Sequence, residues 1–108
     1  MKEHIIDVAR DFTDRPFGRY RDDGNRSGEV FREDILVPAL RKYDHVTVNL
    51  GGTNFYGSSF LEEVFGGLVR RHFSRTELKQ KLTVVHDKLP SVVKEAEKYI
   101  RKAEEAQS

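Results

Sequence analysis

The sequence predicts an α/β fold, with helices packed against a mixed sheet of about four strands. Short β-branched runs alternate along the chain with longer segments whose apolar residues recur three and four positions apart. The 108 residues can enclose one hydrophobic core, and the charged and hydrophobic fractions of 34% and 37% are typical of a globular protein. We therefore expect a single domain over residues 1–108.

The first quarter of the chain combines one strand with an irregular segment. Residues 5–8, Ile-Ile-Asp-Val, predict a short apolar strand. Pro16, Gly18 and Gly24 then break any regular spacing between residues 11 and 25. Residues 18–24 are either an edge strand that enters a turn, which would bring the strands to four, or an ordered loop with a brief extended piece.

A helix is expected to begin at Ser27, whose hydroxyl can accept a hydrogen bond from a first-turn amide. One buried face is predicted by the apolar residues at helical spacing, which are Val30, Phe31, Ile35, Ala39 and Leu40. Pro38 removes one hydrogen bond of the helical ladder, so we expect a kink there. Tyr43 ends this helix, and the β-branched run over residues 45–50 predicts a central strand.

A loop over residues 51–57 joins the central strand to a second helix. Ser59 and Glu62 have the capping-box spacing, which predicts that Ser59 is the N-cap. The apolar stripe of this helix consists of Phe60, Leu61, Val64, Phe65, Leu68 and Val69. Gly66 and Gly67 lie within the stripe at a cost of about 1 kcal/mol each relative to alanine. We therefore expect another backbone to approach them closely.

The last third of the sequence predicts a short helix, a strand and a final helix. Ser74 and Glu77 repeat the capping-box spacing. Residues 82–86 form the strand, and Pro90 occupies the first position of a helix that reaches about Ala106. The charged tail at about residues 104–108 is expected to fray.

The segment 56–61, Tyr-Gly-Ser-Ser-Phe-Leu, resembles a STAS domain, the fold shared by anti-sigma factor antagonists and sulfate-transporter tails. The chain is more closely similar to a bacterial STAS-like family of unknown function. This resemblance is carried by residues 16–24, 27–32, 36–40 and 56–70, and covers roughly residues 5–71. It implies a STAS-like fold.

The resemblance also implies a regulated serine. In the antagonists, a kinase that is also the anti-sigma partner phosphorylates a serine at the helix start, and the matching position here is Ser58. Gly57 stands where the antagonists have an aspartate, and Phe60 where a glycine usually follows the serine pair. The alternative is that the two serines only cap the helix.

An arginine-rich loop provides a second candidate site. Guanidinium groups suit the recognition of carboxylate or phosphate, and the loop carries Arg15, Arg19, Arg21, Arg26 and Arg32. The candidates for binding a partner or an anion are Arg19, Tyr20, Arg26, Arg32, Tyr56 and Ser59. The alternative is that the arginines pair with acidic neighbours such as Asp14, Asp22 and Asp23, and simply hold the loop.

Several functional classes have little support in the sequence. There are no cysteines, and the net charge of +1 argues against nucleic acid as a partner. No apolar run approaches the length of a membrane span, so we expect a cytoplasmic protein that does not bind membranes. The four histidines lack the spacing of metal ligands, and we expect neither a metal nor a cofactor.

A catalytic role is weakly supported. Ser58 could join a triad with Asp87 and one of three histidines, which are His45, His72 and His86. The serine is not in a Gly-x-Ser-x-Gly elbow, because Phe60 replaces the second glycine. The sequence therefore favours a non-enzymatic protein and assigns no catalytic residue.

Two functions remain open. The first is a regulatory or adaptor domain that binds an unidentified protein through the loop and helix over residues 51–63, with phosphorylation at Ser58. The second is a binder of a small anionic ligand, or an unrecognised enzyme, that uses the arginine-rich loop with the Ser58 helix start. Convergence of Arg19 and Arg32 on Ser58 would favour the second function, and pairing of the arginines with carboxylates would favour the first.

Overall fold

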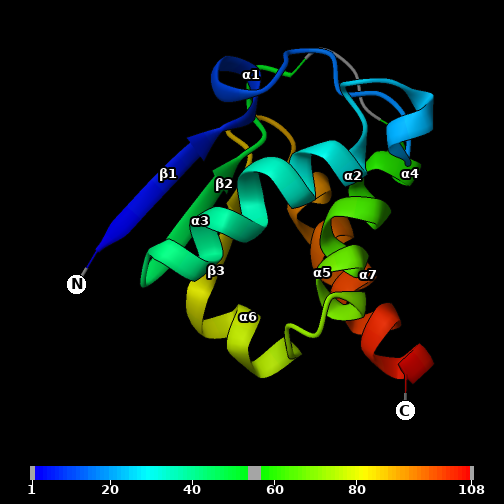
Figure 1. The fold of residues 1–108 in the computed structure, drawn as a ribbon. Coiled ribbons are helices and arrows are strands. Elements are labelled where there is room, and N and C mark those ends of the chain that lie inside the picture. The colour runs from blue at the N-terminus through cyan, green and yellow to red at the C-terminus, as the bar shows by residue number, and fades with distance from the viewer. Residues whose placement is uncertain (1, 54–56, 108) are drawn as a thin grey trace.

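A computed structural model describes residues 2–53 and 57–107. These residues form a three-stranded parallel sheet in the order β1-β2-β3 (Figure 1). The strands are β1 (Glu3–Asp7), β2 (His45–Asn49) and β3 (Leu82–Val85). Ile5 pairs with Thr47, which in turn pairs with Thr83. The predicted central strand at residues 45–50 is therefore confirmed.

The helices occupy the segments between and after the strands (Figure 1). They are α1 (Val8–Asp11), the 3₁₀ turn η1 (Arg21–Asp23), α2 (Gly28–Phe31), the π-helical η2 (Arg32–Leu36), α3 (Val37–Lys42), α4 (Ser58–Leu61), the π-helical η3 (Glu62–Gly66), α5 (Gly67–Arg70), α6 (Arg75–Lys81) and α7 (Pro90–Gln107). Because α2, η2 and α3 follow one another without a break, they form one long helix. The same holds for α4, η3 and α5.

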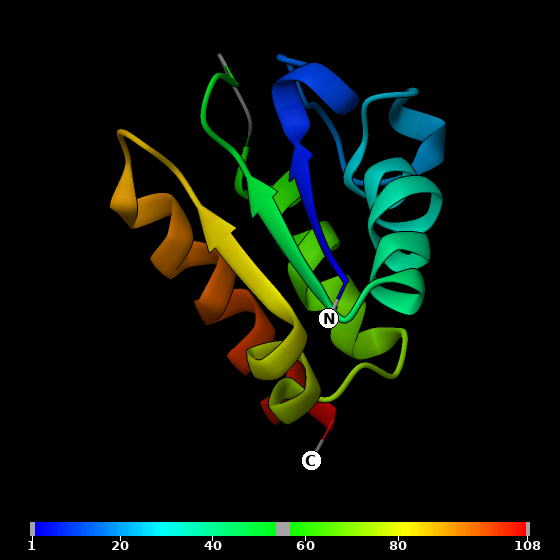
Figure 2. The ribbon, with the colours of Figure 1, turned by 90° about the vertical axis from the view of Figure 1, so that its left-hand side faces the viewer.

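The long helices lie on one side of the sheet, and Figure 2 looks at the opposite side. Ile6, Val46 and Val48 point toward the helices and are at most 1% exposed. The alternate residues face the other way, so Ile5 is 61% exposed and Val85 is 37% exposed. Parallel sheets are usually covered on both faces, whereas the described helices cover one face of this sheet.

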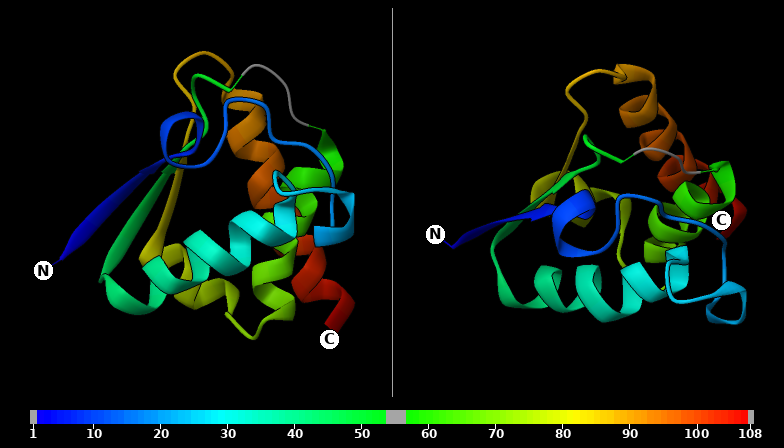
Figure 3. Two further views of the ribbon diagram at one scale, coloured as in Figure 1. Left: turned by 45° about the horizontal axis from the view of Figure 1, so that its top comes forward. Right: turned by 90° about the horizontal axis from the view of Figure 1, so that it is seen from above.

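The core forms where the two long helices and α7 meet the covered face of the sheet (Figure 3). The predicted stripe is buried throughout, since Phe60, Leu61, Val64, Phe65 and Leu68 are all at most 1% exposed. The rings of Phe31 and Phe60 lie 6.2 Å apart, which joins α2 to α4 in the core. Burying this apolar surface is the main favourable contribution to folding.

The prediction of a mixed sheet of about four strands is not confirmed, because the described residues form three strands and both pairings are parallel. The fourth candidate, residues 18–24, is a loop with the η1 turn. Gly18 and Gly24 have φ angles of 91° and 131°, which other residues rarely adopt. The Asp23 carboxylate accepts hydrogen bonds from the amides of Arg19 and Tyr20, at 3.0 and 2.9 Å. These bonds fold the segment on itself and prevent it from extending along a neighbouring strand.

Pro38 lies two residues beyond Leu36, the last residue of the π-helical segment η2. The Val37 amide bonds to the carbonyl of Arg32, five residues back, which is the widened turn of a π-helix. Proline has no amide hydrogen, so a regular ladder would be interrupted here. The predicted distortion therefore takes the form of a π-turn that ends immediately before the proline.

Two of the three predicted serine caps are confirmed. Ser27 accepts a hydrogen bond from the amide of Val30 at 3.3 Å, and Ser74 accepts one from Glu77 at 3.0 Å. At its other end the chain stays helical as far as Gln107, through residues predicted to fray. The side-chain amide of Gln107 donates to the carbonyl of Val69 at 3.4 Å. None of the helices described is long and apolar enough to cross a bilayer.

Candidate protein-interaction face

Ser58 is the first residue of α4 and its side chain is exposed. Its hydroxyl lies near the phenol of Tyr99 on α7. Tyr99 donates to the carboxylate of Glu95 at 2.6 Å. Partial burial and then the bond to Glu95 raise the pKa of Tyr99, whereas the Ser58 hydroxyl acts in the opposite direction. Ser58 therefore lies where the start of one helix meets the side of another.

The prediction that Ser59 caps this helix is wrong. Gly57 occupies the N-cap position, with extended backbone angles, and its carbonyl accepts hydrogen bonds from Phe60 and Leu61 at 3.1 and 3.4 Å. Ser59 consequently lies inside the first turn, and its side chain makes no capping hydrogen bond. The capping-box partner, Glu62, binds arginines instead. Neither serine is explained by a capping role.

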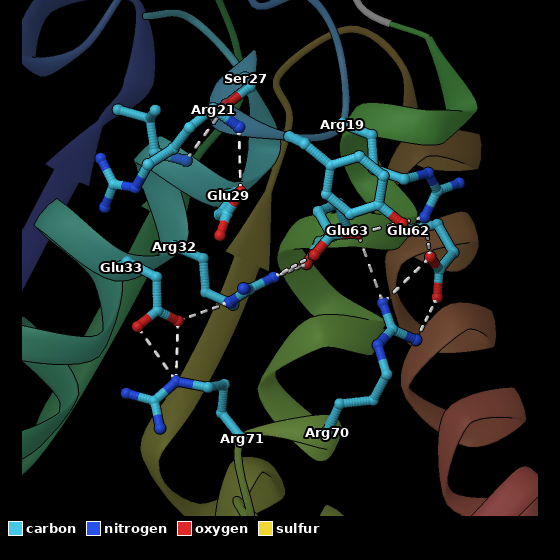
Figure 4. Close-up of polar contacts among 12 residues, drawn as sticks. Arg19, Arg21, Ser27, Glu29, Arg32, Glu33, Glu62, Glu63, Arg70 and Arg71 are labelled. Carbon is cyan, nitrogen blue, oxygen red and sulfur yellow. Dashed lines mark hydrogen bonds and ion pairs between the residues drawn. The ribbon is translucent and has the colours of Figure 1, made fainter. Parts of the chain in front are cut away.

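A buried ion pair joins the two long helices (Figure 4). The side chains of Arg32 and Glu63 are each 8% exposed, and the guanidinium donates to the Glu63 carboxylate at 2.6 Å. The same nitrogen donates to the backbone carbonyl of Glu63 at 2.6 Å, and Nε of Arg32 donates to Glu33 at 2.8 Å. Burial acts to lower the pKa of Arg32, but the bonds to Glu33 and Glu63 outweigh it and raise the pKa.

Three further arginines extend this pair into a network (Figure 4). Arg19, from the loop, contacts Glu62 and also Glu63, the latter at 3.3 Å. Arg70 donates to both carboxylate oxygens of Glu62, at 2.8 and 3.1 Å. Arg71 binds Glu33 at 2.9 Å. The arginine-rich loop and both long helices are thereby connected through charge-assisted hydrogen bonds.

Glycines make room for this network. A Cβ on Gly67 would lie 2.9 Å from the Arg32 guanidinium carbon and would collide with a guanidinium nitrogen. The expectation that Gly66 and Gly67 admit another backbone is therefore wrong, since side chains occupy that space. The close backbone approach occurs at Gly28, where a Cβ would lie 2.8 Å from the carbonyl oxygen of Phe60.

The comparisons with known proteins identify the family. A sequence model described as a STAS-like domain of unknown function (DUF4325) matches residues 27–91, which is more than half of the chain. The chain belongs to this STAS-like family. No curated protein and no solved structure shows significant similarity to it.

The matched region of the STAS-like domain differs from the one predicted by resemblance, which spanned roughly residues 5–71. It begins at the cap residue Ser27 and extends past β3. It contains Ser58 and every member of the ionic network except Arg19. The arginine-rich loop before Ser27 therefore lies outside the matched part of the family.

Other candidate residues of the STAS-like domain are dispersed. Tyr20 is 54% exposed beside the paired Arg19. Arg21 pairs with Asp34 at 2.6 Å. Arg26 is exposed, and its carbonyl accepts a hydrogen bond from Phe17 at 3.0 Å. Tyr56 lies outside the described residues.

Two of the three histidines considered for a catalytic triad, His45 and His86, hold other partners. The ring of His45 lies 2.8 Å from the Thr83 hydroxyl and 3.1 Å from the carbonyl of Gln80. Nδ1 of His86 accepts hydrogen bonds from the amides of Lys88 and Leu89, both at 3.1 Å, in the turn before α7. Both rings make structural hydrogen bonds, so the triad interpretation gains no support from them.

The sequence did not predict roles for Glu63, Arg70, Arg71 or Tyr99. Glu62 was predicted only as the capping-box partner of Ser59. A signal for Glu63 was nevertheless present, because it lies three residues after Phe60 and one before Val64, within the spacing of the buried stripe. A glutamate among buried positions requires a cationic partner.

The network predicts a loss of stability in acid. The bond from Arg71 lowers the pKa of Glu33 below its ordinary 4.5. Burial acts to raise the pKa of Glu62, but the bonds from Arg70 and Arg19 outweigh it and lower that pKa also. A carboxylate with a lowered pKa in the folded state contributes stability above its unfolded pKa, and this is lost as the pH falls through the folded value.

We therefore expect the free energy of unfolding to fall as the pH drops below about 4.5, and Glu33→Gln to reduce this dependence. Urea unfolding of the parent chain and of Glu33→Gln at a series of pH values measures this dependence. Parallel pH profiles for Glu33→Gln and the parent chain would contradict a contribution from Glu33.

Proposed function

We propose that this STAS-like domain is a non-enzymatic regulatory or adaptor domain. It binds a protein partner through the loop–helix face over residues 51–63, with Ser58 as the regulated position. One observation carries the proposal: the Ser58 hydroxyl is exposed and belongs to no cap, so it is accessible to a modifying enzyme or a partner. The resemblance of this segment to anti-sigma factor antagonists supports the same position.

The surroundings of Ser58 explain how phosphorylation would act. A phosphoryl group would lie at the positive end of the helix dipole, which tolerates an anion. It would also compete with Glu95 for the Tyr99 hydroxyl, because that phenol donates to Glu95 and lies near Ser58. The added charge would repel the Glu95 carboxylate. Modification would therefore alter the contact between α4 and α7 and leave the core intact.

The ionic network disfavours the alternative, an anion pocket built from the arginine-rich loop. Arg19 and Arg32 converge, but on Glu62 and Glu63 rather than on Ser58. The four arginines of the network face three glutamates, so most of their charge is compensated inside the domain. The proposal places the domain in the bacterial cytoplasm, where it needs neither a metal nor a cofactor.

Variants of the two serines test the proposal. Ser58→Asp is expected to change partner binding and to leave the thermal midpoint nearly unchanged, because a negative charge is tolerated at a helix start. Ser59→Ala is the matched control. Its partner binding and thermal midpoint should stay close to those of the parent chain, because the Ser59 hydroxyl does not cap the helix.

The measurement is affinity capture from native cells with mass spectrometry, which reports the partners and the modification state of Ser58. Thermal unfolding of each variant accompanies it. If Ser58→Asp captures the same partners in the same amounts as Ser59→Ala, and Ser58 is unmodified, the regulatory role of Ser58 is excluded.

A further inference from the structure

We propose that two copies of this chain dimerise by pairing the outer edges of their β3 strands, antiparallel about a two-fold axis. The inference concerns a different surface from the loop–helix face, and it goes beyond the proposed function. It rests on three observations, which are the composition of the two sheet edges, the direction of the free backbone groups of β3, and a groove beside that strand.

The two edge strands differ in how they are protected against pairing. Exposed edges usually carry charged residues or proline, which discourage another strand from adding to the sheet. Strand β1 carries Glu3, His4 and Asp7. Strand β3 reads Leu-Thr-Val-Val and has neither a charged residue nor a proline. An antiparallel β1 pair centred on Ile5 would also place Glu3 opposite Asp7 of the other copy, and like charges destabilise such pairs.

Among the described residues, no strand pairs with the outer edge of β3. The Val85 carbonyl accepts a hydrogen bond from Leu50 at 2.9 Å, so the polar groups of Val85 face β2. Successive residues of a strand alternate in direction, so the amide and carbonyl of Val84 point outward. In an antiparallel pair centred on Val84, the two copies exchange both of these hydrogen bonds.

A groove of about 370 Å³ lies along this strand between α6 and α7. Its apolar lining comes from Leu78, Leu82, Val84 and Ile100. Its polar rim carries Arg75, Lys79 and Glu97. The groove includes Leu82 at the amino end of β3, next to α6, whereas the 50% exposed Leu89 lies beyond the carboxyl end of the strand. Antiparallel pairing brings Leu89 of one copy toward the groove of the other.

Charge complementarity supports a second copy as the occupant. The segment that carries Leu89 also carries Asp87, whose side chain is 67% exposed. The α6 side of the groove carries the cations Arg75 and Lys79. With β3 antiparallel to its copy, Asp87 of each chain approaches α6 of the other. The surface is therefore self-complementary, as a two-fold interface requires.

Light scattering after size-exclusion chromatography, over a wide range of concentrations, tests the dimer. Leu89→Lys introduces a cation facing Arg75 and Lys79, and should weaken the dimer at least about tenfold. Val84→Pro removes the outward amide and should have the same effect. Ile5→Lys is the matched control on the other edge strand, where Ile5 is 61% exposed, and should leave the dimer intact. Circular dichroism verifies that each variant is folded.

A charge exchange tests the arrangement itself. Lys79→Asp and Asp87→Lys should each weaken the dimer, and the double variant should restore it. A monomer at all concentrations would overturn the proposal. So would a dimer that Ile5→Lys disrupts and Leu89→Lys leaves intact, or a double variant no stronger than either single one.

Discussion

Replacing Glu63 with alanine is expected to lower the free energy of unfolding by about 3–5 kcal/mol, because the buried Arg32 loses one of its two carboxylate partners and keeps only Glu33. Both side chains are 8% exposed, so water cannot replace the lost partner efficiently. Breaking a buried ion pair costs more than the pair contributes, since the remaining charge stays desolvated. Urea unfolding of Glu63→Ala gives the loss directly.

Two further variants show whether the loss comes from breaking the buried ion pair. Glu105→Ala, in the exposed face of α7, should change the free energy of unfolding by less than about 0.5 kcal/mol. The double variant Arg32→Met with Glu63→Leu should recover much of the loss, because apolar residues of similar volume often replace a buried pair without penalty. If Glu63→Ala loses no more stability than Glu105→Ala, the buried pair does not support the fold.

The second large effect is expected for Phe65→Ala. The ring is 0% exposed in the centre of the core, and removing a buried phenylalanine side chain costs about 3–5 kcal/mol. A domain of this size has a total stability of about 5–15 kcal/mol, so this single change can unfold a large fraction of the molecules. The control is Phe17→Ala, at a position 62% exposed, which should leave the thermal midpoint almost unchanged. Similar midpoints for the two variants would contradict a packing role for Phe65.

Local patterns were sufficient to predict the central strand, the two long helices and the final helix, but not α1 or the parallel, three-stranded sheet. The central strand and the stripe around Val64 follow from periodicity, which depends only on neighbouring residues. Ser27 and Ser74 were predicted as caps for the same reason. At Ser59 the prediction failed because Gly57 supplies the backbone geometry of the N-cap two residues earlier.

The ionic network could not be predicted from local patterns. Arg32 and Glu63 are 31 residues apart in the sequence, and Arg19 and Glu62 are 43 apart. Only the packing of the two long helices brings them together. Only nearby aspartates were considered in the sequence as partners of the loop arginines. The sequence therefore predicted neither the ion pair of Arg21 with Asp34 nor that of Arg19 with Glu62. Residues that are close in the sequence do not reveal the ion-pair partner of a cation that lies where two helices pack together.

The two π-turns, η2 and η3, determine how sensitive each long helix is to the loss of one residue. A π-turn contains one residue more than an α-helical turn of the same span, and each residue of an α-helix advances the chain by about 100° around the axis. Deleting one residue within either turn would leave a regular helix that is easier to form in isolation. Because the shortened turn would cover the same span, residues on both sides of the deletion would keep their facing, and Phe60 and Leu68 would both stay in the core. A deletion in the α-helical parts of the same helix would instead rotate the residues on one side by about 100° relative to the other. Each π-turn is thus the place where its long helix can be shortened by one residue without losing its tertiary contacts.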